Sequence, residues 1–152
     1  MHIETQFSIL LMNKPGVLSQ ILNALAQEKI NIIAITMMDS IEHGMLRVVT
    51  TKPTQTRQAL EHLNVMVNET EVLCINLSNK AGALADVATL LSEAHINISY
   101  AYCTAGARGG RTTGILKVAD LKKAMRVLEK NTNKKPVKKE KNIRANPARK
   151  TR

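Results

Sequence analysis

The sequence predicts an α+β fold in which two copies of one βαββαβ unit follow each other in tandem, with a basic tail behind them. Three observations lead to this prediction. A motif returns after 66 residues, both copies show the same succession of strand-like and helix-like patterns, and positive charge gathers at the C-terminal end. A chain of 152 residues is long enough for one modest domain or for two very small ones.

The internal repeat organises the chain. Residues 13–18 read NKPGVL, and residues 79–84 read NKAGAL. At the same spacing of 66 residues, the Ile-Asn-Ile of residues 30–32 returns at residues 96–98. Eight of the twenty positions from 13 to 32 are identical under this single register. A tandem duplication explains this agreement, because chance rarely keeps a loop, a helix and an exit segment in one register.

Apolar periodicity predicts the elements of the first copy. Segments with alternating or continuous apolar and β-branched residues are typical of strands. From Val17, apolar residues recur at i+1, i+4, i+5 and i+8, which places them on one face of a helix. The expected order is a strand at 6–12, a helix from Val17 to about residue 26, strands at 31–38 and 45–51, a helix at 54–63, a strand at 65–67 and a turn at 68–70.

The second copy repeats this order and then departs from it. It is expected to contain a strand at 72–78, a helix with a thinner apolar stripe from Ala83, strands at 97–104 and 113–118 and a helix at 120–130. No credible fourth strand follows. In a ferredoxin-like βαββαβ sandwich the fourth strand lies beside the first, so the strand at 72–78 keeps an open edge. We expect the other copy or a second chain to cover this edge, and we predict a homodimer.

The predicted domains are residues 1–71, residues 72–133 and a tail at 134–152. A single copy buries too little surface to be stable alone, so the copies should share an interface. The tail holds nine Lys and Arg and one acid, or +8 of the net +10. It has almost no apolar residues and is expected to be disordered. It either solubilises the protein or makes weak contact with nucleic acid or another polyanion.

Several classes of protein are disfavoured. No run approaches 18 apolar residues and the start lacks a signal-like pattern, so a cytoplasmic protein without a membrane span is expected. No catalytic motif is present and the four histidines are isolated, so neither an enzyme nor a metal or cofactor site is predicted. Cys74 and Cys103 are expected in core or half-buried strand positions. Six methionines are expected to fill gaps in a core poor in aromatic residues: Met12, Met37, Met38, Met45, Met66 and Met125.

The loop motif and the Ile-Asn-Ile exit in both copies resemble the ACT domain family. That family comprises small ferredoxin-like regulatory domains that usually bind amino acids and often control enzymes of amino-acid metabolism. The resemblance implies a ligand between the loop after the first strand and the second strand of a neighbouring domain. Some members place a His where this chain has Leu11 and Leu77. Carried over by position, the site residues are Asn13, Lys14, Pro15, Gly16, Val17, Leu18, Asn31, Ile32, Asn79, Lys80, Ala81, Gly82, Ala83, Leu84, Asn97 and Ile98.

The residue types also suit such a ligand. A glycine at the loop–helix junction lets a ligand approach the backbone, and the first amides of a helix favour a carboxylate. An Asn side chain offers a donor and an acceptor to a zwitterion. In the first copy, we expect the loop with Gly16 and the second strand with Asn31 to converge on one zwitterion. Structural roles stay open, because Asn13 and Asn79 could cap helices and Asn31 and Asn97 could close turns.

The sequence therefore predicts a non-catalytic tandem ACT regulatory protein that binds a small ligand, an amino acid. One alternative is a regulatory subunit that docks on an amino-acid biosynthetic enzyme, since the length and the first-copy pattern are similar to those of acetolactate synthase small subunits. The other is a nucleic-acid-associated protein that acts through the tail.

Overall fold

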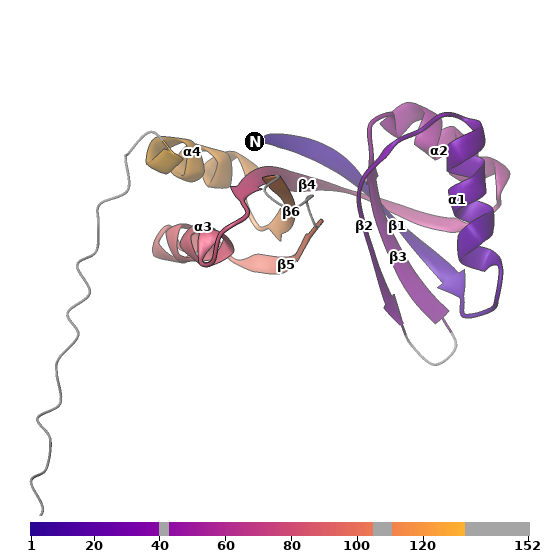
Figure 1. The fold of residues 1–152 in the computed structure, drawn as a ribbon, viewed down its shortest axis with the longest axis horizontal. Coiled ribbons are helices and arrows are strands. Elements are labelled where there is room, and N and C mark those ends of the chain that lie inside the picture. The colour runs from indigo at the N-terminus through magenta and orange to yellow at the C-terminus, as the bar shows by residue number, and fades with distance from the viewer. Residues whose placement is uncertain (40–42, 105–110, 133–152) are drawn as a thin grey trace, which may run out of the picture.

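The computed structural model describes residues 1–39, 43–104 and 111–132, and these residues form the predicted α+β fold. Six strands make one antiparallel sheet in the order β2-β3-β1-β4-β6-β5, with four helices (Figure 1). The elements are β1 (His2–Met12), α1 (Val17–Gln27), β2 (Ile32–Asp39), β3 (His43–Thr50), α2 (Pro53–His62), β4 (Met66–Ser78), α3 (Ala83–Glu93), β5 (Ile98–Cys103), β6 (Arg111–Val118) and α4 (Leu121–Thr132).

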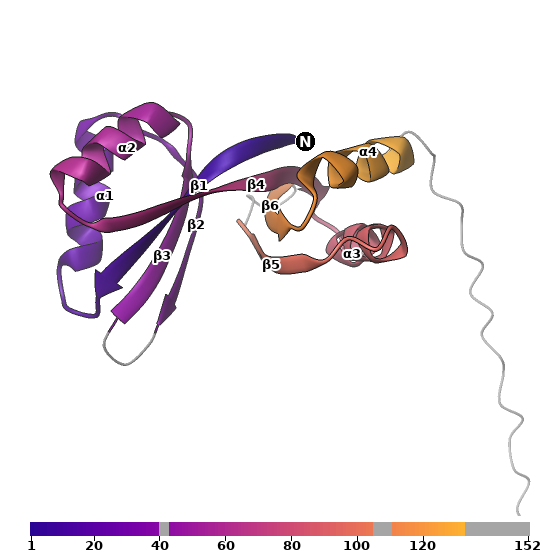
Figure 2. The same ribbon diagram turned by 180° about the vertical axis from the view of Figure 1, so that it is seen from behind.

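Both helix pairs cover the same face of this sheet. Phe7 belongs to the apolar core under α1 and α2, and Leu73 belongs to the core under α3 and α4. Ile3 lies on the same face of β1 as Phe7, because side chains alternate along a strand, and Ile3 is paired with Leu73. The sheet twists so strongly that the two helix pairs lie at opposite ends of the molecule, with the strands between them (Figure 1, and from behind Figure 2).

Strand β4 belongs to both units. Residues 66–74 pair with β1, and residues 73–78 pair with β6. The predicted turn at 68–70 is therefore wrong, and the expected domain boundary after residue 71 falls inside a continuous strand. Asn68, Glu69 and Thr70 favour a turn locally, but the ladder to β1 holds them extended with their side chains turned mainly to solvent.

The start of β1 supplies part of the missing fourth strand of the second unit. Residues 2–4 pair antiparallel with residues 72–74. Of the two expected covers, the other copy and a second chain, the other copy therefore covers this part of the edge. Beyond it, residues 75–78 pair with β6 on one side, and no strand of the described chain pairs with them on the other.

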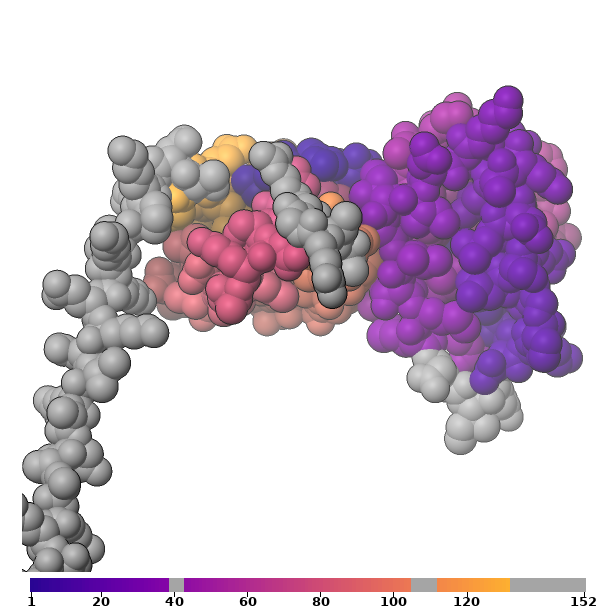
Figure 3. All heavy atoms as spheres, in the orientation of Figure 1, coloured from indigo at the N-terminus to yellow at the C-terminus, as the bar shows by residue number. Residues whose placement is uncertain are grey.

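The helix-free face of the sheet folds over itself where the two units meet, which confirms the expected shared interface. Gln6 of β1 is fully buried there and donates to the Tyr100 hydroxyl at 2.8 Å, and the Tyr102 hydroxyl donates to Gln6 Oε1 at 3.0 Å. The Arg47 guanidinium lies 3.9 Å from the Tyr100 ring centroid. An apolar cluster lies around these contacts and comprises Ala34, Val49, Val72, Cys74 and Ile115. In the space-filling view the units touch directly (Figure 3).

The prediction that the methionines fill the core is wrong for four of the six. Met12, Met37, Met38 and Met66 are 54%, 43%, 45% and 73% exposed. The ladders give the reason for Met38 and Met66. Met38, Met45, Leu10 and Met66 are successive cross-strand partners, so they form one row across the face that no helix covers.

Of the two cysteines, Cys74 is buried as expected, whereas Cys103 is exposed, contrary to the prediction. No helix in the described ranges is long and apolar enough to cross a membrane. The basic tail lies outside the described residues.

Candidate functional site

The loop of the first copy leads into α1 through a glycine with a left-handed backbone. Gly16 is the N-cap residue, with φ of 92°, and no side chain caps the helix. Gly82 takes the same place before α3, with φ of 88° and again no side-chain cap. The alternative that Asn13 and Asn79 cap the helices is therefore wrong. A Cβ added at Gly16 would meet nothing within 4 Å, so the surface above this loop is open.

The same copy does not bring Asn31 to this loop. Met12, just before the loop, is paired with His43, whereas Ile32, just after Asn31, is paired with Thr50. These positions lie seven residues apart on β3, or about 23 Å at the usual rise of a strand. The expected convergence within the first copy is wrong, because the loop precedes α1 and Asn31 follows it.

Asn97 stands in the equivalent place of the second copy, beyond the end of α3. The backbone carbonyl of each asparagine continues the pairing of two neighbouring strands by one step, because its donor lies just past the end of the adjacent strand. The Thr51 amide donates to the Asn31 carbonyl at 3.0 Å, and the Ala119 amide donates to the Asn97 carbonyl at 3.1 Å. Both side chains are left exposed. Asn97 and Ile98 also line a surface hollow with Ala88, Ser92, His95 and Ile96.

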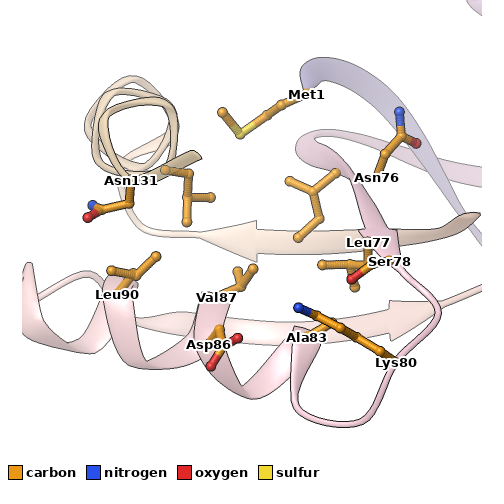
Figure 4. Close-up of a pocket in the computed structure, with 12 residues that line it drawn as sticks. Met1, Asn76, Leu77, Ser78, Lys80, Ala83, Asp86, Val87, Leu90 and Asn131 are labelled. Atoms are coloured by element: carbon orange, nitrogen blue, oxygen red, sulfur yellow. The ribbon is translucent and has the colours of Figure 1, made fainter. Parts of the chain in front are cut away.

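The loop of the second copy borders a cavity of about 400 Å³ between β4, α3 and α4 (Figure 4). Lys80 and Ala83 are the two predicted site residues among its lining residues. Figure 4 shows Lys80 and Asp86 on one side of this cavity and Met1 on the opposite side. The apolar part of the lining consists of Met1, Ile75, Leu77, Ala83, Val87, Leu90 and Leu128, and the polar part of Asn76, Ser78, Lys80, Asp86 and Asn131.

Sequence reasoning missed most residues of this cavity. The available signal was the missing fourth strand of the second copy, because in the first copy that strand occupies the corresponding place. There Val65 packs against the core under α1 and α2. The cavity is thus a consequence of the difference between the repeats.

The titratable groups with perturbed pKa values lie elsewhere. Arg57 donates to both carboxylate oxygens of Glu69, one of them at 2.6 Å, and this hydrogen bonding lowers the pKa of Glu69. Burial raises the pKa of the Cys74 thiol to about 11, so this thiol is a poor nucleophile at neutral pH. Within the described ranges, no group of three His, Cys, Asp or Glu side chains could hold a metal ion.

Comparison with known proteins gives a consistent result. Residues 1–144 match the family described as an ACT domain pair. Protein BT0572 from Bacteroides thetaiotaomicron is 31% identical, with a TM-score of 0.79 over 86% of this chain and 89% of that chain. The ligand-free regulatory subunit of aspartate kinase from Thermus thermophilus shares the fold, with a TM-score of 0.64 at 13% identity over 85% and 94% of the two chains. No curated protein matches this chain.

Proposed function

This chain belongs to the ACT domain pair family, and on that premise we propose that it is a non-catalytic regulatory protein that binds an amino acid between two copies of itself. The observation that carries this proposal is the position of β2. It is an edge strand of the sheet, and Ile32, Ile35, Met37 and Met38 on it are 39–45% exposed. A long apolar edge strand is a natural place for another strand to pair.

Pairing of β2 with β2 of a second copy would complete the site that one copy leaves open. β2 runs parallel to β1, since each is antiparallel to β3. The end of β2 at Asp39 therefore lies at the same end of the sheet as the loop that follows Met12, with β3 between them. In a two-fold antiparallel pair, the start of the partner's β2 falls at that end. The second copy would thereby bring its Asn31 toward the first copy's loop.

The groups gathered in this way suit a zwitterion. The first-turn amides of α1 have no partners within the helix and would donate hydrogen bonds to a carboxylate near Gly16, where the surface is open. Lys14 adds positive charge on the exposed loop. The amide group of Asn31 from the second copy would meet the ammonium or the carboxylate through its oxygen or its nitrogen.

Calorimetry with the twenty amino acids tests this proposal. We expect heat with at least one of them, and binding at least tenfold weaker in Gly16→Asp and in Asn31→Ala, because each loses bonds to a charged group worth about 1.5–3 kcal/mol. Asn97→Ala makes the same change in the second unit and serves as the matched control, with affinity within about twofold of wild type. Absence of heat at millimolar concentrations would favour a subunit that docks on an enzyme without binding an amino acid.

A further inference from the structure

The positive charge of the chain begins at α4 and not behind it. Residues 121–152 hold thirteen Lys and Arg against two acids, or +11, whereas residues 1–120 hold nine Lys and Arg against ten acids, or −1. The boundary falls inside the described structure, since α4 spans Leu121–Thr132. α4 itself holds four bases and one acid, so the helix and the tail form one uninterrupted basic stretch of the sequence.

Three of these bases form a row on the outer side of α4. Lys122, Arg126 and Lys130 follow each other at intervals of four residues, so they lie on one side of the helix, about 6 Å apart along its axis. All three are exposed, whereas Ala124 and Leu128 on the other side are buried in the core under α3 and α4. The apolar side thus holds the helix in place, and the basic row faces solvent at the end of the molecule away from α1 and α2 (Figure 1).

Contacts within the described residues do not neutralise this row. The two salt bridges among these residues, His2–Glu4 and Arg57–Glu69, both lie in the first unit. The fourth base of α4 has a structural role instead, because the Lys123 ammonium donates to the Ala94 carbonyl at 2.8 Å and so ties α4 to the end of α3. Glu129 is the one acid of the helix and is also exposed, so it offsets one of the three charges of the row.

The first unit shows that packing of this helix does not require the charge. α2 is the counterpart of α4 in the repeat, and it packs on the core of its unit in the same way. It holds one base, Arg57, and one acid, Glu61, and Arg57 is bonded to Glu69 of the neighbouring strand. The outer side of α2 therefore has no excess of positive charge. The basic row is a property of the second unit alone, and it calls for a role other than folding.

The aromatic residues indicate which kind of polyanion fits such a surface. Single-stranded nucleic acid is typically bound by stacking of its bases on aromatic side chains. The chain has no Trp, Phe7 is fully buried, and Tyr100 and Tyr102 are engaged with Gln6 where the two units meet. None of its aromatic rings is therefore available as a stacking platform. A duplex needs no such platform, because it presents regularly spaced phosphates on its outside.

We propose that the basic row of α4 and the tail together bind the phosphate backbone of a nucleic-acid duplex without reading its sequence. Lys122, Arg126 and Lys130 would each contact a phosphate from an ordered helix, and the bases of the tail would contact further phosphates. Three contacts alone are too few for measurable binding, so the tail is required, while the helix fixes where the duplex lies on the protein. This surface is separate from the amino-acid site proposed above, and either can fail without the other.

Two double variants of the full chain with equal net charge test the role of α4. Lys122→Gln with Lys130→Gln removes two charges from the basic row, and Lys29→Gln with Lys52→Gln removes two exposed charges from the first unit. Binding to a fluorescein-labelled DNA duplex is measured by fluorescence anisotropy over a range of salt concentrations. At about 0.1 M salt, the α4 variant should bind at least tenfold more weakly than the unsubstituted chain, and the control variant within about twofold of it.

The salt dependence separates lost phosphate contacts from a change in net charge. Each phosphate contact with duplex DNA contributes about 0.9 to the slope of log affinity against log salt concentration, so the slope of the α4 variant should be smaller by about 1.8. The slope of the control variant should not change. Equal losses in the two variants, an unchanged α4 variant, or no binding of the unsubstituted chain at about 50 mM salt would each overturn the proposal.

Other polyanions test the class of partner on the unsubstituted chain. Duplexes of two unrelated sequences should bind with affinities within about twofold of each other, and a DNA and an RNA duplex of one sequence show which backbone is preferred. Tighter binding of a single strand of the same length, or of polyglutamate as a model of an acidic protein, would overturn the choice of a duplex.

Arg126, in the middle of the row, gives a test by single substitutions. Arg126→Gln should lower affinity for the duplex at least threefold at about 0.1 M salt, because one phosphate contact is lost. Arg126→Lys keeps the charge and should bind within about twofold of the unsubstituted chain. Equal loss in both variants would contradict the proposal, since it would show that a change in the helix and not the lost charge weakens binding.

Discussion

Single residues in the left-handed backbone region decide where the helices of both units begin and end. Gly16 and Gly82 precede α1 and α3 with φ of 92° and 88°, and Lys29 and His95 follow these helices with φ of 52° and 54°. Glycine adopts this conformation freely, whereas a side chain is strained in it. The same pattern in both copies shows that the duplication preserved backbone geometry as well as sequence.

This pattern predicts opposite effects at the two ends of α1. Gly16→Ala should lower the free energy of unfolding by about 1–2 kcal/mol, since the new Cβ has space but the backbone does not favour it. Lys29→Gly removes a strained side chain and should keep or raise stability by up to about 1 kcal/mol. Urea denaturation followed by circular dichroism measures both, and a stability unchanged by Gly16→Ala would contradict the assigned backbone.

Tyr102 makes stability depend on alkaline pH. Burial raises the pKa of this phenol above its ordinary value near 10, so the folded chain disfavours the phenolate. The resulting stability is fully present below pH of about 10 and is lost as the pH rises above it. Tyr102→Phe should therefore weaken the fall in stability between about pH 9 and pH 11, which is the range in which a free phenol ionises. Identical pH profiles in the two proteins would exclude this cause.

At the scale of elements, local sequence patterns predicted the helices and most of the strands of each copy. The extent of β1 and the continuity of β4 depend on long-range strand pairing, which local patterns do not contain. Apolar periodicity located all four helices, because each has a clear buried face. It missed the continuity of β4, since Asn68, Glu69 and Thr70 have turn propensity and only the ladder to β1 keeps them extended. It also left out residues 2–5 of β1, which find their partners some 70 positions later in the chain. The expected convergence of the loop and Asn31 in the first copy failed for the same reason, because Asn31 is close to the loop in sequence but lies at the other end of α1.

The exposures of the methionine side chains predict an order of methionine oxidation. Met66 and Met12, at 73% and 54% exposure, should be oxidised by dilute hydrogen peroxide before the half-buried Met45 and Met125. Peptide mapping by mass spectrometry over a time course measures the order. Equal rates at all four sites would show that Met12 and Met66 are covered in solution.

At the scale of the molecule, most of the net positive charge lies in the tail and little of it in the body. Because +8 of the net +10 lies in residues 134–152, removal of these residues should abolish any binding to polyanions. The melting temperature should stay the same, since a segment with almost no apolar residues contributes little burial. Differential scanning calorimetry and a heparin-binding assay test the two expectations. A large loss of melting temperature would mean that the tail packs on the body.

The shared strands and the Gln6 contacts join the two units into one body, while the loop and Asn31 of one copy remain far apart. The proposed amino-acid site therefore requires two chains, and mixing two defective variants tests this most directly. Gly16→Asp chains lack a working loop, and Asn31→Ala chains lack the opposing amide, so each homodimer should bind the amino acid found with wild type at least tenfold more weakly than wild type does. After subunit exchange in an equal mixture, half of the dimers should be mixed, and each mixed dimer carries one intact site. Calorimetry should then recover about one quarter of the wild-type sites per chain at wild-type affinity. No recovered binding after demonstrated exchange would contradict a site built from two copies.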